Sequence, residues 1–173
     1  MPIGTIQTMT FSIHQASAPV FIRALTSLSN MMDKAIAGGA DEAALLAARL
    51  APDMHPFPRQ IQMASDSAKG AVARLAGVEV PAMADTEASF AELKERIEKT
   101  IAYVQSLDAS AFEGAEDREV VLKFPGNELT FTGAQFLTGF ALPNFFFHVS
   151  MAYALLRANG VALGKMDFLG APN

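Results

Sequence analysis

The chain has 173 residues, of which 51% are hydrophobic and 18% charged, and this length is enough for one domain with a buried core, predicted over residues 1–173. The formal net charge of −5 argues against nucleic-acid binding through a basic surface. The sequence contains no cysteine, which excludes disulfides, thiolate metal ligands and cysteine nucleophiles and fits a reducing compartment. Residues 1–9 contain no basic cluster followed by an apolar segment, so we expect no signal peptide and a cytoplasmic protein.

Two long helices are predicted in the first half of the chain, over residues 13–37 and 57–75. In both, apolar residues recur every three or four positions, which is the spacing of an amphipathic helix. Between them, Asp41 is expected to cap a short helix that ends near Arg49, and three prolines then predict an extended corner.

A third helix, capped by Asp85 or Thr86, is predicted to run to about Leu107. Opposite charges lie four residues apart along it, as in Glu92 and Arg96, and this spacing favours ion pairs on the surface of a helix. We therefore expect the charged side of this helix to be a solvated face.

The pattern changes to a period of two over residues 120–131, which predicts a β-hairpin that turns at Pro125-Gly126. Thr132 is then expected to open a fourth long helix, Gly133–Ala158, and the Asn-Gly pair that follows is a typical helix end. The remaining residues to the end of the chain are expected to pack as a loop.

Four long amphipathic helices, with the hairpin before the last of them, predict an all-α fold, a four-helix bundle. The fourth helix is apolar nearly all round, so it is expected to be central in the bundle or covered by a partner subunit, which predicts a homodimer. It also resembles a membrane span, but Pro143, Asn144 and His148 favour a buried bundle helix and no membrane partner.

Asn144 and His148 are the best candidates for chemistry, because a helix this apolar has few reasons to contain polar residues. They are four residues apart and share one helix face, which is expected to line an inward pocket. His14, near the start of the first helix, is expected to face inward as well. Neutral imidazole is a good ligand for zinc, nickel, copper or iron, and bundle cores often hold metal sites. A single inward histidine is more often a hydrogen-bonded core residue, and both interpretations stay open.

Gln62 and Asp66 lie four residues apart on the second long helix, away from the centre of its core face. They are expected to be surface residues unless that helix packs on two sides. The chain lacks the motifs HExxH, GxGxxG and GxSxG, the P-loop, and the Glu-x-x-His pattern of di-iron bundles. Motifs therefore assign no reaction to the chain.

Several segments carry a resemblance to a known family: residues 50–79 (LAPDMHPFPRQIQMASDSAKGAVARLAGVE), 86–100, 129–161 (LTFTGAQFLTGFALPNFFFHVSMAYALLRANGV) and 164–170 (GKMDFLG). Together they resemble an uncharacterised bacterial family, a domain of unknown function in the DinB/YfiT-like superfamily. The resemblance covers residues 11–170, nearly the whole chain.

This resemblance implies a four-helix bundle with up-down-down-up winding, often dimeric. Many members of the superfamily bind a divalent metal through three histidines, one from the second helix and a His-x-x-x-His pair from the fourth, and some are thiol-dependent transferases or isomerases. Here the pair reads Asn144-x-x-x-His148, and the second helix has no histidine. Gln62 is the nearest counterpart on that helix.

The expected function is therefore that of a DinB-like bundle with a polar, ligand-binding pocket around His148 and Asn144, which Gln62 or His14 approaches from another helix, and without the usual three-histidine site. Asp66 or His14 could replace a missing ligand. The alternative is a metal-dependent transferase or hydrolase that uses zinc or nickel, with His148 as ligand or general base. A third possibility is a structural dimer whose polar core residues only fix the packing.

Overall fold

The structure is a computed structural model, and it describes residues 11–170 of the chain. The predicted absence of a signal peptide concerns residues 1–9 and lies outside the described residues, as does the end of the predicted C-terminal loop, residues 171–173.

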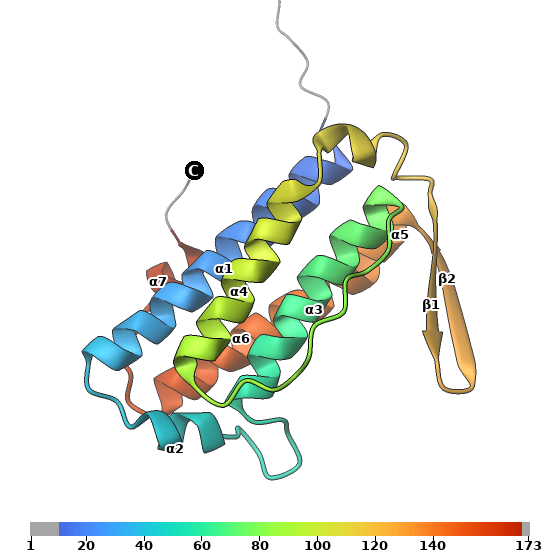
Figure 1. Ribbon diagram of the computed structural model, residues 1–173. Coiled ribbons are helices and arrows are strands. Elements are labelled where there is room, and N and C mark those ends of the chain that lie inside the picture. Colours follow the sequence, from blue (N-terminus) through green and yellow to red (C-terminus); the bar gives the residue numbers. More distant parts are fainter. Residues whose placement is uncertain (1–10, 171–173) are drawn as a thin grey trace, which may run out of the picture.

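Four long helices lie side by side and form the body of the molecule (Figure 1). They are α1 (Ile13–Ala37), α3 (Phe57–Ala76), α4 (Phe90–Ser106) and a last helix that consists of α5 (Gly133–Phe136), a π-helical turn (Leu137–Ala141) and α6 (Leu142–Ala158). α3 packs on both α4 and α6, and α1 contacts all three of them. The predicted all-α four-helix bundle is confirmed.

Shorter elements join the long helices: α2 (Glu42–Ala47), a 3₁₀ turn (Ala109–Phe112), β1 (Glu119–Phe124), β2 (Asn127–Thr132) and α7 (Lys165–Leu169). The two strands pair antiparallel and form a hairpin that leans away from the bundle, directly before the last helix as predicted (Figure 1). The predicted C-terminal loop is wrong over α7, which is helical and packs on α1, where Lys34 pairs with Asp167 at 2.5 Å.

Local signals explain where the helices begin and end. The Ser12 hydroxyl accepts the backbone N–H of Gln15, and the Gln15 side chain accepts the N–H of Ser12, which forms a capping box for α1. Asp41 caps α2 as predicted by accepting the N–H of Ala44. Gly77 ends α3 with φ of 72°, a left-handed conformation that favours glycine.

α4 begins later than predicted, because its N-cap is Ser89 and neither Asp85 nor Thr86. The Ser89 hydroxyl accepts the backbone N–H of Glu92 at 3.2 Å. Asp85 instead forms an ion pair with Arg96 at 3.0 Å, so it belongs to the connector that runs along α4 rather than to the helix start.

Arg96 is buried, and the predicted solvated face is wrong at this position. Its exposed fraction is 3%, and its guanidinium binds Glu87 at 2.9 Å and Asp66 at 2.8 Å. The predicted pair with Glu92 is not formed, since that carboxylate accepts a backbone N–H of the connector. The connector, residues 78–89, covers this side of α4 and turns a surface position into an internal one.

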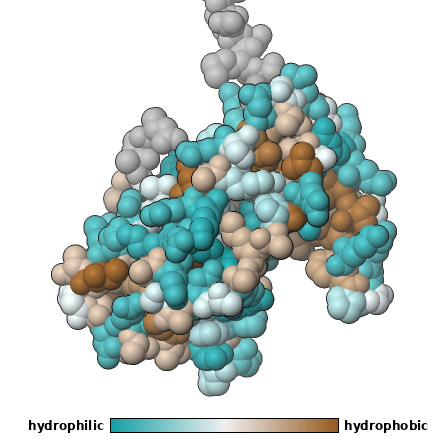
Figure 2. Space-filling model, in the orientation of Figure 1, coloured by the Kyte–Doolittle hydropathy of each residue, from teal (hydrophilic) through white to brown (hydrophobic). Residues whose placement is uncertain are grey.

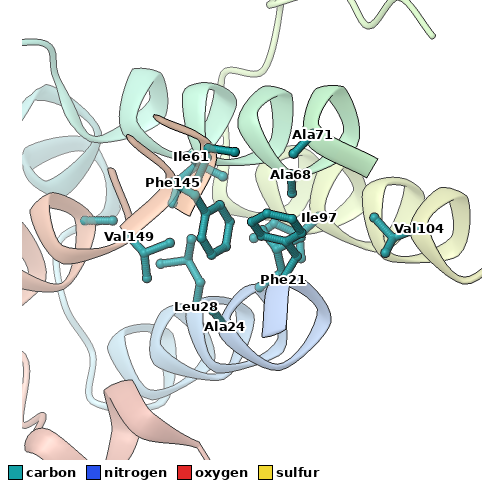
Figure 3. Packing of buried hydrophobic residues seen from close by; sticks show 14 of the residues in the cluster. Phe21, Ala24, Leu28, Ile61, Ala68, Ala71, Ile97, Val104, Phe145 and Val149 are labelled. Carbon is teal, nitrogen blue, oxygen red and sulfur yellow. The ribbon is translucent and has the colours of Figure 1, made fainter. Parts of the chain in front are cut away.

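Large apolar side chains from the four long helices meet in the core (Figure 3). The rings of Phe21 on α1 and Phe145 on α6 meet edge to face with their centroids 4.8 Å apart. Ile61 of α3 and Ile97 of α4 join them, and all four side chains are fully buried. Burial of such a side chain stabilises the fold by about 1.5–3 kcal/mol, so this cluster fixes α6 against its neighbours.

The last helix, Gly133–Ala158, is long and apolar enough to cross a membrane by length and composition, and 39% of its most apolar window is buried. Its inner side packs on α1 and α3, as the core helix of a bundle does. Its outer side is also apolar: Phe147 is 50% exposed, and Met151 and Ala154 are half-buried.

Candidate functional site

His148 projects from α6 toward α3, where its ring meets a glutamine. Nδ1 of His148 lies 2.9 Å from Oε1 of Gln60, and Nε2 of Gln60 donates to the carbonyl of His55 at 3.1 Å. Because the second bond orients the amide, Oε1 faces the ring, and we assign the ring proton to Nδ1, which donates. The free electron pair of the ring is then on Nε2.

Burial keeps this imidazole neutral. The exposed fraction of His148 is 4%, and its burial lowers the pKa below the ordinary value of 6.5. Positive charge at His55 and Arg59 lowers this pKa further. His148 is therefore a neutral, oriented ring that ties α6 to α3.

Asn144 lies one helical turn before His148 and also reaches α3. Its Nδ2 donates to the hydroxyl of Ser67 at 2.7 Å, and that hydroxyl donates to the carbonyl of Met63 at 2.7 Å. The prediction that Asn144 and His148 share a face is consistent with these bonds, since each residue contacts α3. The two polar pairs are separate, and Met63 lies between Gln60 and Ser67 along α3.

A cleft of about 300 Å³ opens beside Asn144, between α3, β1 and the last helix. We call it the Asn144 cleft. Its lining consists of Arg59, Met63, Asp66, Ser67, Ala71, Arg74, Leu122, Lys123, Phe124, Phe136, Phe140, Ala141 and Asn144. Figure 2 shows hydrophobic surface where the hairpin meets the bundle, in the region of this cleft. His148 does not line it, so the polar pocket is next to Asn144 rather than around the histidine.

The charges of the cleft are mostly positive. Arg59 pairs with Asp85 at its rim, and Lys123 lies 4.0 Å from Glu128 with an 80% exposed side chain. Arg74 is half-buried, and its Nη1 donates to a backbone carbonyl of α3 at 2.9 Å. Burial lowers the pKa of this guanidinium.

The structure does not bring Gln62 to His148. Gln62 is buried, contrary to the expected surface position, because α3 packs on two sides, and its amide donates to Glu87 at 2.9 Å. Asp66 is partly exposed and accepts from the buried Arg96 at 2.8 Å. Both residues belong to the ion-pair network under the connector, on another side of α3 from Gln60.

His14 also lies apart from His148. Its ring contacts the ring of Phe112 edge to face, with centroids 5.1 Å apart, and both line a separate hollow with Thr138. Thr138 precedes His148 by ten residues, which is nearly three turns of the last helix. The two histidines that the sequence places inward are therefore at different ends of the bundle.

The donor set does not fit the metal centre that the superfamily implies. Within residues 11–170, no three or more His, Cys, Asp or Glu side chains are grouped so that they could hold a metal ion. The hydrogen bond from His148 to Gln60 would orient a ligating imidazole. The position four residues earlier, where the superfamily has the other histidine of the pair, holds Asn144, which is hydrogen-bonded to a hydroxyl. One imidazole and amide oxygens are a poor donor set for zinc or nickel.

Gln60, Ser67 and Arg74 are site residues that the sequence reasoning missed. They follow each other at intervals of seven along α3, a spacing that places residues on one helix face. This signal was present in the sequence. What spacing cannot supply is the register between α3 and α6, which decides that Gln60 rather than Gln62 meets His148.

Comparison with known proteins agrees with this fold. The family described as Domain of unknown function (DUF1993) matches residues 13–169. A crystal structure of a DinB family member protein from Shewanella denitrificans superposes with a TM-score of 0.83 at 36% sequence identity, covering 92% of this chain and 93% of that chain. No curated protein matches the chain significantly. The chain therefore belongs to the DUF1993 family, a DinB-like family of unknown function, as its sequence resemblance predicts.

Proposed function

We propose that this protein is a ligand-binding DinB-like bundle whose site is the Asn144 cleft, and that it lacks the three-histidine metal centre of its superfamily. The observation that carries this proposal is the 2.7 Å hydrogen bond between Asn144 and Ser67, at a position where the resemblance implies a ligating histidine. A carboxamide and a hydroxyl can recognise polar groups of an organic molecule, whereas they are weak ligands for zinc or nickel. We assign no cofactor to the chain.

His148 has a supporting role in this proposal. Its bond to Gln60 holds α6 against α3 one turn from Asn144, and so keeps the wall of the cleft in place. The alternative, a metal-dependent transferase or hydrolase with His148 as ligand or base, has less support, because this ring is 4% exposed and does not line the cleft. Because Asn144 and Ser67 offer an amide and a hydroxyl and not metal ligands, the ligand is expected to be a small organic molecule.

Two-dimensional NMR of the isotope-labelled protein with a library of small organic fragments tests the proposed site. We expect binding fragments to shift the backbone resonances of Ser67, Leu122 and Phe140, which line the cleft. Asn144→Leu should remove these shifts, and the control Gln105→Leu, on an exposed part of α4, should leave them unchanged. Shifts confined to another surface, or shifts that survive Asn144→Leu, would contradict the assignment of the site.

The outer face of α6 supports a second proposal, a homodimer. Phe147 is 50% exposed on this face, beside the half-buried Met151 and Ala154, and a second copy would cover the same apolar stripe. The Asn144 cleft faces the hairpin, so each protomer would keep a complete site.

A further inference from the structure

Arg74 is a cation without a carboxylate partner in a partly buried place. Its only hydrogen bond within the described residues goes to the carbonyl of Gly70 at 2.9 Å, and no acidic side chain there forms an ion pair with it. Burial lowers its pKa, because desolvation disfavours the charged form. A guanidinium that is half-desolvated and unpaired is stabilised by an anion.

Gly70 gives this guanidinium its position. A Cβ at residue 70 would lie 2.6 Å from Nη1 of Arg74, so the missing side chain leaves the space that Arg74 occupies along α3. The side chain is thereby laid back over its own helix and lines the Asn144 cleft.

The other charges of the cleft are already engaged. Arg59 pairs with Asp85, and the Asp66 carboxylate is shared by the buried Lys69 and Arg96, at 2.8 Å from each. Lys123, in the same lining, is 80% exposed and lies 4.0 Å from Glu128. Arg74 is therefore the cation of the cleft that is half-buried and has no carboxylate partner among the described residues. One such guanidinium matches one carboxylate group, which can accept two parallel hydrogen bonds from its planar fork.

The wall opposite α3 is mostly apolar, and Lys123 is its one charged residue among the described residues of the lining. Leu122 and Phe124 come from β1, and Phe136 and Phe140 from the last helix, where their two rings stack with centroids 6.1 Å apart. Leu122 and Phe136 are buried, whereas Phe124 is exposed and Phe140 is half-buried, and both line the cleft. These residues offer hydrophobic and aromatic contact to a ligand body.

We infer that the Asn144 cleft binds a small monocarboxylate with an apolar body, its carboxylate on the guanidinium of Arg74 and its body against Phe124 and Phe140. This inference rests on the proposed function and specifies the ligand class for the same site. Asn144 and Ser67, on the floor of the cleft, contact a further polar group of the ligand where one is present.

The test compares two probes of the same shape, 4-phenylbutyrate and its uncharged amide, by titration calorimetry and NMR with the full chain. We expect the carboxylate to bind about tenfold more tightly than the amide, because a hydrogen bond to a charged group is worth more than a neutral one. The NMR shifts on the wild-type protein should include Arg74 and the cleft residues.

Two substitutions locate the anion. Arg74→Met removes the charge and keeps most of the side-chain volume, and it should remove the preference for the carboxylate. Gly70→Ala displaces only the flexible end of Arg74, so the protein should stay folded while carboxylate binding weakens several-fold. Arg23→Met, an exposed arginine of α1 outside the cleft, should leave both affinities unchanged.

Each result decides the inference. Equal affinity for carboxylate and amide would overturn the assignment of a carboxylate ligand. So would a preference for the carboxylate that survives both Arg74→Met and Gly70→Ala. In either case the proposed ligand-binding function still stands if the NMR shifts remain in the cleft. Absence of binding by either probe at millimolar concentration would also overturn it. Absence of cleft shifts with every fragment of the library would overturn the proposed function itself.

Discussion

At the scale of single residues, His148 makes the stability of the fold depend on pH. Its burial lowers its pKa in the folded chain, whereas the unfolded chain has the ordinary value of 6.5. Below that value the unfolded state binds the proton more readily than the folded state. The stabilisation from neutral His148 is therefore complete above pH 6.5 and is lost as the pH falls below it.

We predict that the free energy of unfolding falls between about pH 7 and about pH 5 by up to about 1.4 kcal/mol per pH unit, the limit for one proton. Urea denaturation of the wild type and of His148→Gln measures it, and the variant should lose most of this dependence. The pKa values of Glu87 and Asp167 are lowered, so these two carboxylates titrate below this pH range and do not contribute to the dependence. His14→Gln, whose ring lies apart from His148 and beside Phe112, is the control and should keep the wild-type dependence. A slope in His148→Gln identical to that of the wild type would refute the role of this ring.

How far the site could be predicted from sequence differs between its residues. The polar pair Asn144 and His148 could be identified because both interrupt an apolar helix at a spacing of four. Gln60 and Ser67 share one face of α3 at a spacing of seven, but their pairing with His148 and Asn144 could not be predicted, because helix periodicity gives the face of α3 and not its register against α6. That register is set by ring packing such as Phe21 on Phe145, a contact between distant parts of the chain.

At the scale of elements, Arg96 joins α4, α3 and the connector. It is 3% exposed and binds Asp66, Asp85 and Glu87. The helical periodicity predicts Arg96 on the surface. This prediction is wrong, because the sequence pattern of one helix does not show that an extended connector covers it. The same pattern is correct for Lys99, whose exposed pair with Glu95 is at 2.7 Å.

We predict that Arg96→Met lowers the free energy of unfolding by about 3 kcal/mol, because it leaves Glu87, whose side chain is 12% exposed, without its ion-pair partner. Asp66 keeps its pair with Lys69, and Asp85 keeps its pair with Arg59. Lys99→Met on the same helix is the matched control and should cost less than about 0.5 kcal/mol. Thermal and urea unfolding of both variants measure the difference. Equal stability of the two variants would show that the buried network contributes nothing net.

At the scale of the whole molecule, the predicted bundle, its hairpin and most helix limits agree with the structure, because caps, glycines and apolar periods are local signals. The oligomeric state could be predicted less well, since the sequence shows only that the last helix is apolar on more sides than the core of one bundle covers. The structure supplies the surface that remains outside, with Phe147 half exposed on α6.

We predict that the protein sediments at twice its chain mass of 18.4 kDa at micromolar concentration. Phe147→Glu places a charge on the outer face of α6 and should give the monomer mass, because burial of an unpaired charge opposes association. Ile36→Glu, at an exposed apolar residue near the end of α1, should remain dimeric. A monomeric wild type would contradict the dimer and mean that this face of α6 is free in solution.

The central claim, that the metal positions of the superfamily hold a polar site for an organic ligand, is tested most directly by zinc titration. Calorimetry should find no tight, stoichiometric zinc binding by the wild type. Met63→His combined with Asn144→His should gain affinity at least about tenfold, since Met63 lies on α3 between Gln60, which contacts His148, and Ser67, which contacts Asn144. The control pair Gln62→His and Asn144→His should gain little, because Gln62 faces Glu87. One tightly bound zinc per wild-type chain, lost in His148→Ala, would contradict the account.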